Sequence, residues 1–278
     1  MVRIFGSRKC LEYDAYPESP IRVERSYKLL KENYEIHEPC PCDESEVLLA
    51  HGELFAEKLK NYSPSIFDLD SPPVPGIYEY ALLSAGGALS ALDSADERSF
   101  SLMRPPGHHV GRNFLGGFCY LNNIAIAIRK SMAKFDRAAI VDFDCHHGNG
   151  TQDIFLGDSR VLYVSLHQYG IYPGTGYVSE ENCRNYPLRS GTGEEEYMST
   201  LAKALEEVKK FDPQIVGVSA GFDIYRGDPI TSLSLEIGSF KRIGEAIRDL
   251  GLPAFAVLEG GYSSEFPLCV EAFLEGLS

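Results

Sequence analysis

Five short runs of apolar and β-branched residues, separated by segments of helical periodicity, constrain the fold of this chain most strongly. The runs cover residues 100–103, 138–143, 161–166, 215–219 and 254–258. Runs of this kind are typical of strands that are buried on both faces of a sheet. Helical periodicity covers residues 78–92, 121–135, 194–211 and 235–250. The alternation predicts an α/β fold with a mainly parallel sheet and helices on both faces.

The chain is expected to form a single domain over residues 1–278. That length fits one large α/β domain, and no linker rich in Gly or Ser divides it. The segments around residues 23–30 and 46–59 look helical and are expected to pack around the sheet. Two long loops, at residues 63–75 and from residue 167 to about residue 193, are expected to carry function, because long loops in compact domains usually do.

The charge balance and the cysteines restrict the classes of partner. The chain has 26 Lys and Arg against 40 Asp and Glu, a formal charge of −14, which is the wrong sign for a nucleic-acid binder. No apolar run of about 18 residues and no signal-peptide pattern is present, so no membrane association is expected. The seven cysteines are an odd number, which indicates free thiols and a cytoplasmic protein. Cys40 and Cys42 are interpreted as loop thiols, and their redox activity stays open.

Acidic residues and a histidine follow two of the predicted strands. Asp142, Asp144 and His146 lie at the end of one run, and alternation places them on one side if the strand persists that far. Asp223 follows the run at residues 215–219. The ligand site of a parallel sheet lies beyond the carboxyl ends of its strands. Buried carboxylates need a partner or a cation, and a capped strand end without a ligand is the alternative.

Asp144, His146 and Asp223 make a set of two carboxylates and one imidazole. Three protein ligands with an open position are typical of a catalytic zinc site, where the metal lowers the pKa of water and polarises a carbonyl. Zinc more often has mainly His or Cys ligands, so the oxygen-rich set leaves Fe²⁺, Co²⁺ or Mn²⁺ open.

Two further turns carry candidate catalytic residues. His108 and His109 follow a Pro-Pro-Gly turn at a strand end. A histidine can accept a proton near neutral pH and return it, and Asp142 would hold one of the rings. Tyr262 follows two glycines after the last strand, where its hydroxyl could point at an oxyanion. A structural role is the alternative in both turns, and for the Gly-Gly-Tyr turn alone it is the favoured one.

Eight motifs in a fixed order carry a family resemblance. They are RPPGHH, GGFCYLNN, VDFDCHHGNGTQDIF, VSLH, YPGTG, SAGFD, GDPI and LEGGY. In this order they resemble the zinc-dependent histone deacetylase and acetylpolyamine amidohydrolase superfamily, with a class II-like pattern. The resemblance is close over residues 70–262 and looser at residues 17–20. It implies an arginase/deacetylase-like fold and the hydrolysis of an acetamide to acetate and a free amine.

The resemblance also implies two cation sites. One Zn²⁺ per chain would be bound by Asp144, His146 and Asp223. A structural K⁺ near the zinc would be bound by Asp142, Asp144, His146, Ser165 and the carbonyl of Leu166. A second monovalent site is not legible in the sequence.

Catalytic roles follow from the same resemblance. It implies that His109 is the general base and then the acid, while His108, held by Asp142, stabilises charge. Tyr262 would polarise the substrate carbonyl beside the metal. Asn149 stands where class I deacetylases carry an Asp. Asn is the class II and polyamine-enzyme pattern, and it removes a charge that would raise the basicity of His109.

A narrow tunnel for the acetylated side chain is the last implied feature. Phe118 and Tyr172 match its two walls, and the carbonyl of Gly117 would line it. Asp70 matches a rim carboxylate that holds the substrate backbone. Ile230 occupies a gatekeeper position where one eukaryotic polyamine deacetylase has a Glu, although similar bacterial polyamine enzymes also have Ile. Without the resemblance, Phe118 and Tyr172 would be interpreted as packing residues.

These observations favour a zinc-dependent deacetylase of acetyl-lysine or similar N-acetylated amines. Acetylpolyamine hydrolysis is the second hypothesis. An arginase-like ureohydrolase is more distant, because its two-manganese cluster typically uses Asp-x-His-x-Asp and Gly148 stands at the last position. A non-catalytic acetyl-lysine binding module is disfavoured, because every catalytic position is filled. The oligomeric state stays open.

Overall fold

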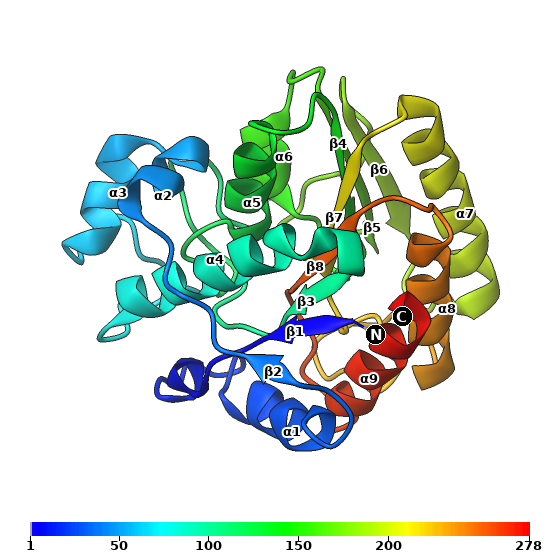
Figure 1. Cartoon of the computed structure of the whole chain (residues 1–278), viewed down its shortest axis with the longest axis horizontal. Coiled ribbons are helices and arrows are strands. Elements are labelled where there is room, and N and C mark those ends of the chain that lie inside the picture. Colours follow the sequence, from blue (N-terminus) through cyan, green and yellow to red (C-terminus); the bar gives the residue numbers. More distant parts are fainter. Residues whose placement is uncertain (1) are drawn as a thin grey trace.

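One parallel sheet of eight strands forms the centre of the molecule in a computed structural model that describes residues 2–278 (Figure 1). The strands are ordered β2-β1-β3-β8-β7-β4-β5-β6, and all neighbouring pairs are parallel. Their bounds are Arg3–Phe5 (β1), Ile36–His37 (β2), Ser99–Ser101 (β3), Ala138–Asp142 (β4), Val161–Gln168 (β5), Cys183–Leu188 (β6), Ile215–Ala220 (β7) and Ala254–Leu258 (β8). The α/β fold predicted from the sequence is confirmed.

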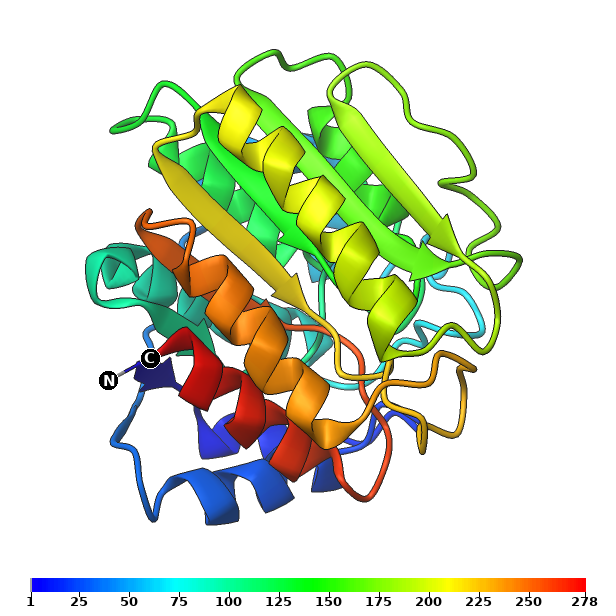
Figure 2. The same cartoon turned by 90° about the vertical axis from the view of Figure 1, so that its right-hand side faces the viewer.

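Helices cover both faces of this sheet. Their bounds are Ile21–Leu30 (α1), Glu44–Ala50 (α2), Glu53–Lys60 (α3), Ile77–Asp93 (α4), Asn123–Ser131 (α5), Asn149–Phe155 (α6), Glu194–Phe211 (α7), Ile237–Arg248 (α8) and Phe266–Leu277 (α9). Figure 2 shows α7, α8 and α9, coloured from yellow-green to red, side by side on one face. Helices α4 and α5 pack together on the other face.

The two faces of the sheet belong to two hydrophobic cores. Along β4, Ala139 and Val141 contribute to the core under α7, α8 and α9, whereas Ala138 and Ile140 contribute to the core under α4 and α5. Successive residues of a strand point to opposite faces. Burial on both faces therefore explains why the sequence shows a continuous apolar run here.

Three strands were not predicted. The short strands β1 and β2 lie in the amino-terminal region that was expected to be helical, and two or three residues are too few to show an alternation. Strand β6 lies inside the segment that was predicted to be a long loop, so that prediction was wrong for Cys183–Leu188. As an edge strand, β6 tolerates Arg184, Asn185 and Pro187, which hide the usual strand pattern.

The parallel order places several strand ends next to one another. Asp142 at the end of β4 pairs in register with Ser165 of β5 and Ser219 of β7. Ser219 in turn pairs with Val257 of β8. The segments that follow these strands therefore start from one edge of the sheet. Over residues 2–278, no helix has the length and apolar character needed to cross a membrane.

Candidate metal centre and active site

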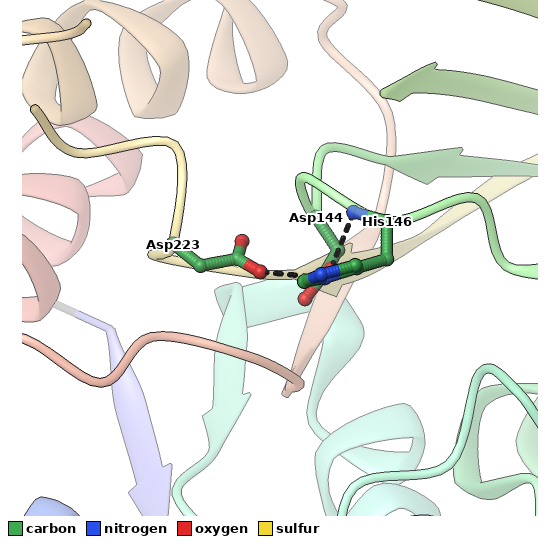
Figure 3. Close-up of side chains that lie close together, drawn as sticks. All are labelled: Asp144, His146 and Asp223. Carbon is green, nitrogen blue, oxygen red and sulfur yellow. Dashed lines mark hydrogen bonds and ion pairs between the residues drawn. The ribbon is translucent and has the colours of Figure 1, made fainter. Parts of the chain in front are cut away.

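Three side chains from two strand ends point at one spot. Figure 3 shows Asp144 and His146, from the segment after β4, facing Asp223, from the segment after β7. Their ligand atoms all lie within 4.8 Å of one another. His146 Nδ1 is 2.9 Å from Asp223 Oδ2 and 3.1 Å from Asp144 Oδ1. The structure thus brings together the three residues that the sequence suggested as metal ligands.

Backbone groups hold the two carboxylates in place. The amide of Gly260 donates to Asp144 Oδ2 at 2.7 Å, and the amide of Cys145 donates to Asp223 Oδ1 at 2.8 Å. Gly221 passes so close that a Cβ atom there would lie 2.2 Å from Asp144 Oδ2. The glycine in the SAGFD motif is therefore required for the approach of the two strand ends.

The donor set fits a divalent cation. Asp144 and Asp223 are both buried, and the polar group that faces Asp223 Oδ2 is Nδ1 of His146, at 2.9 Å. Burial and the charge of Asp144 raise the pKa of Asp223. Burial alone would lower the pKa of His146, but hydrogen bonds to the two carboxylates raise it to about 10. An imidazole between two buried carboxylates matches the residues that hold a metal ion.

His108 is held by a buried carboxylate. Its Nδ1 lies 3.1 Å from Asp142 Oδ2, which also accepts the hydroxyl of Tyr163 at 2.9 Å. The amide of Asp144 donates to Asp142 Oδ1 at 3.1 Å. Burial alone would lower the pKa of His108, but the charges of Asp144, Asp142 and Glu259 raise it to about 10. These carboxylates therefore favour the protonated form of the ring.

The surroundings of His109 favour the neutral ring, in contrast to those of His108. Its Nδ1 lies 2.8 Å from Asn149 Oδ1, so this nitrogen carries the hydrogen and Nε2 keeps a free lone pair. Burial and the charges of His108 and His146 lower the pKa of His109 well below its usual value. The ring is 6.1 Å from the ring of His146, centroid to centroid. The surroundings thus favour the protonated form of His108 and the neutral form of His109.

These groups lie at the base of a cavity of about 240 Å³. The residues that line it, other than two prolines, are Asp70, His108, His109, Gly117, Phe118, Asp144, His146, Tyr172, Ile230, Gly260 and Tyr262. The Tyr172 ring stands 4.9 Å from the His109 ring, and the Phe118 ring stands 6.1 Å from the Tyr262 ring. All five residues predicted to bind the substrate line this cavity, with Asp70 exposed.

Tyr262 is positioned as a hydrogen-bond donor. Burial raises the pKa of its hydroxyl well above the usual value, although the nearby Arg22 opposes the shift. The guanidinium carbon of Arg22 lies 4.6 Å from the centre of the Tyr262 ring. The hydroxyl therefore keeps its proton at neutral pH.

The residues expected to bind a monovalent cation are only partly brought together. Asp142 and Ser165 are opposite each other in the β4–β5 register, and Leu166 follows. The hydroxyl of Ser165, however, is 2.8 Å from Nδ1 of His167.

Cys40 is exposed and Cys42 is buried, and both are free thiols.

Sequence reasoning missed two buried acids beside the site. Glu259 Oε2 accepts the amides of Gly107 and His108 at 2.8 Å and 3.1 Å. Asp228 Oδ2 accepts the amide of Tyr262 at 2.7 Å. Burial raises the pKa of each carboxyl to about 7. An acid directly after the apolar run at residues 254–258 was the available signal for Glu259.

A buried ion cluster also escaped prediction. Glu18 accepts two hydrogen bonds from Arg104, at 2.7 Å and 2.8 Å, and one from Arg22 at 2.8 Å. Arg22 further donates to the carbonyls of Glu259 and Gly261, at 2.6 Å and 2.5 Å. The cluster therefore fixes the turn that precedes Tyr262.

Comparisons with known proteins agree with this geometry. Residues 16–277 match the family model of the histone deacetylase domain. A probable deacetylase of Archaeoglobus fulgidus is 38% identical, over 91% of this chain and 80% of its own length. Acetylpolyamine amidohydrolase 1 of Pseudomonas aeruginosa is 39% identical, over 72% of this chain and 62% of its own. The crystal structure of an acetylpolyamine aminohydrolase from Burkholderia pseudomallei superposes with a TM-score of 0.93 at 26% identity, covering 99% and 98% of the two chains.

Proposed function

We propose that zinc is the metal of this chain, which belongs to the histone deacetylase domain family and is a metal-dependent deacetylase of acetylated amines. We further propose that acetylated lysine side chains are its main substrate class. The observation that carries this proposal is the grouping of Asp144, His146 and Asp223 next to two adjacent histidines at the base of a narrow cavity. One domain, spanning residues 1–278, would carry the whole reaction.

The proposed reaction replaces the amide C–N bond by a C–O bond and gives acetate and an amine. When held by the two carboxylates and the imidazole, zinc supplies a Lewis acid that polarises a carbonyl and acidifies water. His109 is suited to take a proton from the attacking water through Nε2, because Asn149 fixes the hydrogen on Nδ1. The same nitrogen then returns the proton to the leaving amine.

Two donors would stabilise the negative charge that develops on the acetyl oxygen. The hydroxyl of Tyr262 keeps its proton and lines the cavity, which suits it to donate to that oxygen. Asp142 favours the protonated form of His108, which would lower the energy of negative charge in its surroundings. Removing one such donor costs about 3 kcal/mol in related acyl-transfer chemistry.

The cavity supports a slender, mostly aliphatic substrate. Phe118 and Tyr172 form aromatic walls, and Ile230 stands at the mouth. Apart from the metal-ligand candidates, Asp70 is the acid among the lining residues and is placed to accept substrate N–H groups. An apolar gatekeeper gives a polycation no specific attraction, although similar bacterial polyamine enzymes also have Ile at this position.

Acetylpolyamine hydrolysis is the second candidate. It is supported by the 39% identity to the Pseudomonas aeruginosa enzyme. The formal charge of −14 attracts cationic substrates of either class and discriminates little between them. A ureohydrolase is less well supported. A Cβ at Gly148 would lie 2.3 Å from Asp142 Oδ2, so the position where a ureohydrolase carries an acid has no room for a side chain.

Three further features belong to this proposal. A structural K⁺ near the zinc would use Asp142, Asp144, His146, Ser165 and the carbonyl of Leu166. The free thiols support a cytoplasmic location. The partners would be acetylated amines and not nucleic acid.

The test compares kcat/KM of the zinc-loaded protein for an acetyl-lysine peptide, acetylputrescine and acetylspermidine, with a chelator control. A preference for the peptide would support the lysine deacetylase, whereas a preference for the polyamines would support the second candidate. Metal analysis is the companion measurement. One zinc per chain supports the proposal, whereas two manganese ions per chain would contradict it.

A further inference from the structure

Asp228 connects two turns that carry substrate-facing residues. Its Oδ2 accepts the amide of Tyr262 at 2.7 Å, and its Oδ1 accepts the amide of Ile230 at 3.1 Å. Tyr262 lies in the segment after β8, and Ile230 lies in the segment after β7. One carboxylate therefore links the turns of Tyr262 and Ile230, and both of these residues line the cavity.

The buried environment of Asp228 disfavours the ionised form of its carboxyl group. The residue is 7% exposed, and the charge of Arg22 opposes the effect of burial on its pKa only in part, since no Lys, Arg or His within residues 2–278 forms a direct ion pair with it. A buried carboxylate without a counter-charge destabilises the fold unless hydrogen bonds compensate. A buried acid that lowers the stability of the fold is typical of positions that serve function.

We propose that Asp228 is a positioning residue that aligns the hydroxyl of Tyr262 with the substrate carbonyl and ties this alignment to the turn of Ile230. This inference rests on the proposed function, in which Tyr262 donates to the acetyl oxygen. Asp228 does not line the cavity, so it acts through the two backbone amides that it holds.

The carboxylate is the group that the geometry requires. Both of its oxygens accept a hydrogen bond from a backbone amide, an arrangement that suits the ionised form because that form is an acceptor at both oxygens. In Asp228→Asn, one oxygen becomes an NH₂ group, which would face an N–H donor. The shape of the side chain is kept, but one of the two turns loses its anchor.

The experiment is a double-mutant cycle with Asp228→Asn, Tyr262→Phe and the double variant, all zinc-loaded and assayed on an acetyl-lysine peptide. Asp228→Asn is expected to lower kcat about tenfold or more, the usual effect of losing a charge-assisted hydrogen bond. In the Tyr262→Phe background the same change should have little further effect on kcat, because residues that act as a unit are not additive. Losses that multiply in the double variant would overturn the inference.

A second substrate separates positioning from general destabilisation. The carbonyl of trifluoroacetyl-lysine is already activated and depends less on a hydrogen-bond donor. The loss of kcat in Asp228→Asn should therefore be smaller on this substrate than on acetyl-lysine. An equal loss on both substrates would contradict the inference.

Controls keep the outcomes distinct. Asp43→Asn changes a carboxylate that caps α2, where Asn is an equally good cap, and it should leave kcat unchanged. Zinc content and the melting temperature show whether each variant is folded. If Asp228→Asn does not fold, Asp228→Ser enters the same cycle. Full activity of Tyr262→Phe would overturn both the proposed function and this inference, whereas multiplying losses would overturn this inference alone.

Discussion

Acidification should destabilise this protein through His51, a buried histidine outside the catalytic site. The Nδ1–H group of His51 donates to the carbonyl of Gly111 at 3.0 Å, and Nε2 accepts the amide of Asn122 at 3.0 Å. The contact with Asn122 requires the neutral ring, because a protonated ring has an N–H donor on both nitrogens and Nε2 could no longer accept. Burial lowers the pKa of His51 to about 4, and the hydrogen bond to Gly111 only partly opposes this shift.

The magnitude follows from the difference between the folded and unfolded pKa values. An unfolded histidine has a pKa of about 6.5. The folded state binds the proton less tightly, so the stabilisation is fully present above about pH 6.5 and is lost as the pH falls from there to about 4. The loss attributable to His51 is about 2 kcal/mol at pH 5 and about 3 kcal/mol below pH 4.

The assay is urea unfolding of the zinc-loaded wild type and of His51→Gln, each between pH 5 and pH 7.5. The glutamine side chain has no charge to gain, so the variant should lose about 2 kcal/mol less than the wild type over this range. Other buried groups titrate equally in both proteins, and the difference isolates His51. An identical pH dependence of stability in both proteins would refute this reasoning.

Four further outcomes are expected. Gly221→Ala should weaken zinc binding about tenfold or more in a chelator competition, since the new methyl group would overlap Asp144 Oδ2, and unchanged affinity would contradict this. Ile230→Glu should raise kcat/KM for acetylspermidine relative to the peptide about fivefold, as an ion pair of about 1 kcal/mol would. Asn149→Asp should raise the pKa of His109, so that the acid limb of the pH profile of kcat/KM moves to higher pH. Chelation of the metal should lower the melting temperature, because the buried carboxylates then repel each other.

The sheet could be predicted from the sequence where its strands are central. Strand β4 is buried on both faces, so its residues are apolar without interruption up to Asp142. Strand β6 escaped because an edge strand keeps polar residues and proline. Strand β1 escaped because three residues carry no periodicity. A strand that is buried on both faces has a continuous apolar sequence that can be recognised, whereas an edge strand or a very short strand has no such pattern.

The metal-ligand candidates could be predicted because strand ends meet at one edge of a parallel sheet. Asp144 and Asp223 are 79 residues apart, yet each follows a buried strand, and that rule alone brings them together. Tyr163 and Asp228 could not be found in this way. Their partners are Asp142 and the amide of Tyr262, and these contacts depend on the register and on the course of long turns.

Backbone amides and histidine rings, rather than Lys or Arg side chains, contact the acids around the site. Asp144, Asp223, Asp228 and Glu259 each accept at least one backbone N–H, and within residues 2–278 none of them pairs with Lys or Arg. Amides are fixed dipoles, and the amide at Asp223 binds Oδ1 and leaves Oδ2, which faces His146, to a metal. A lysine in their place would occupy that oxygen and neutralise the charge that binds the cation. The arrangement therefore keeps an affinity for a divalent ion that a conventional buried salt bridge would remove.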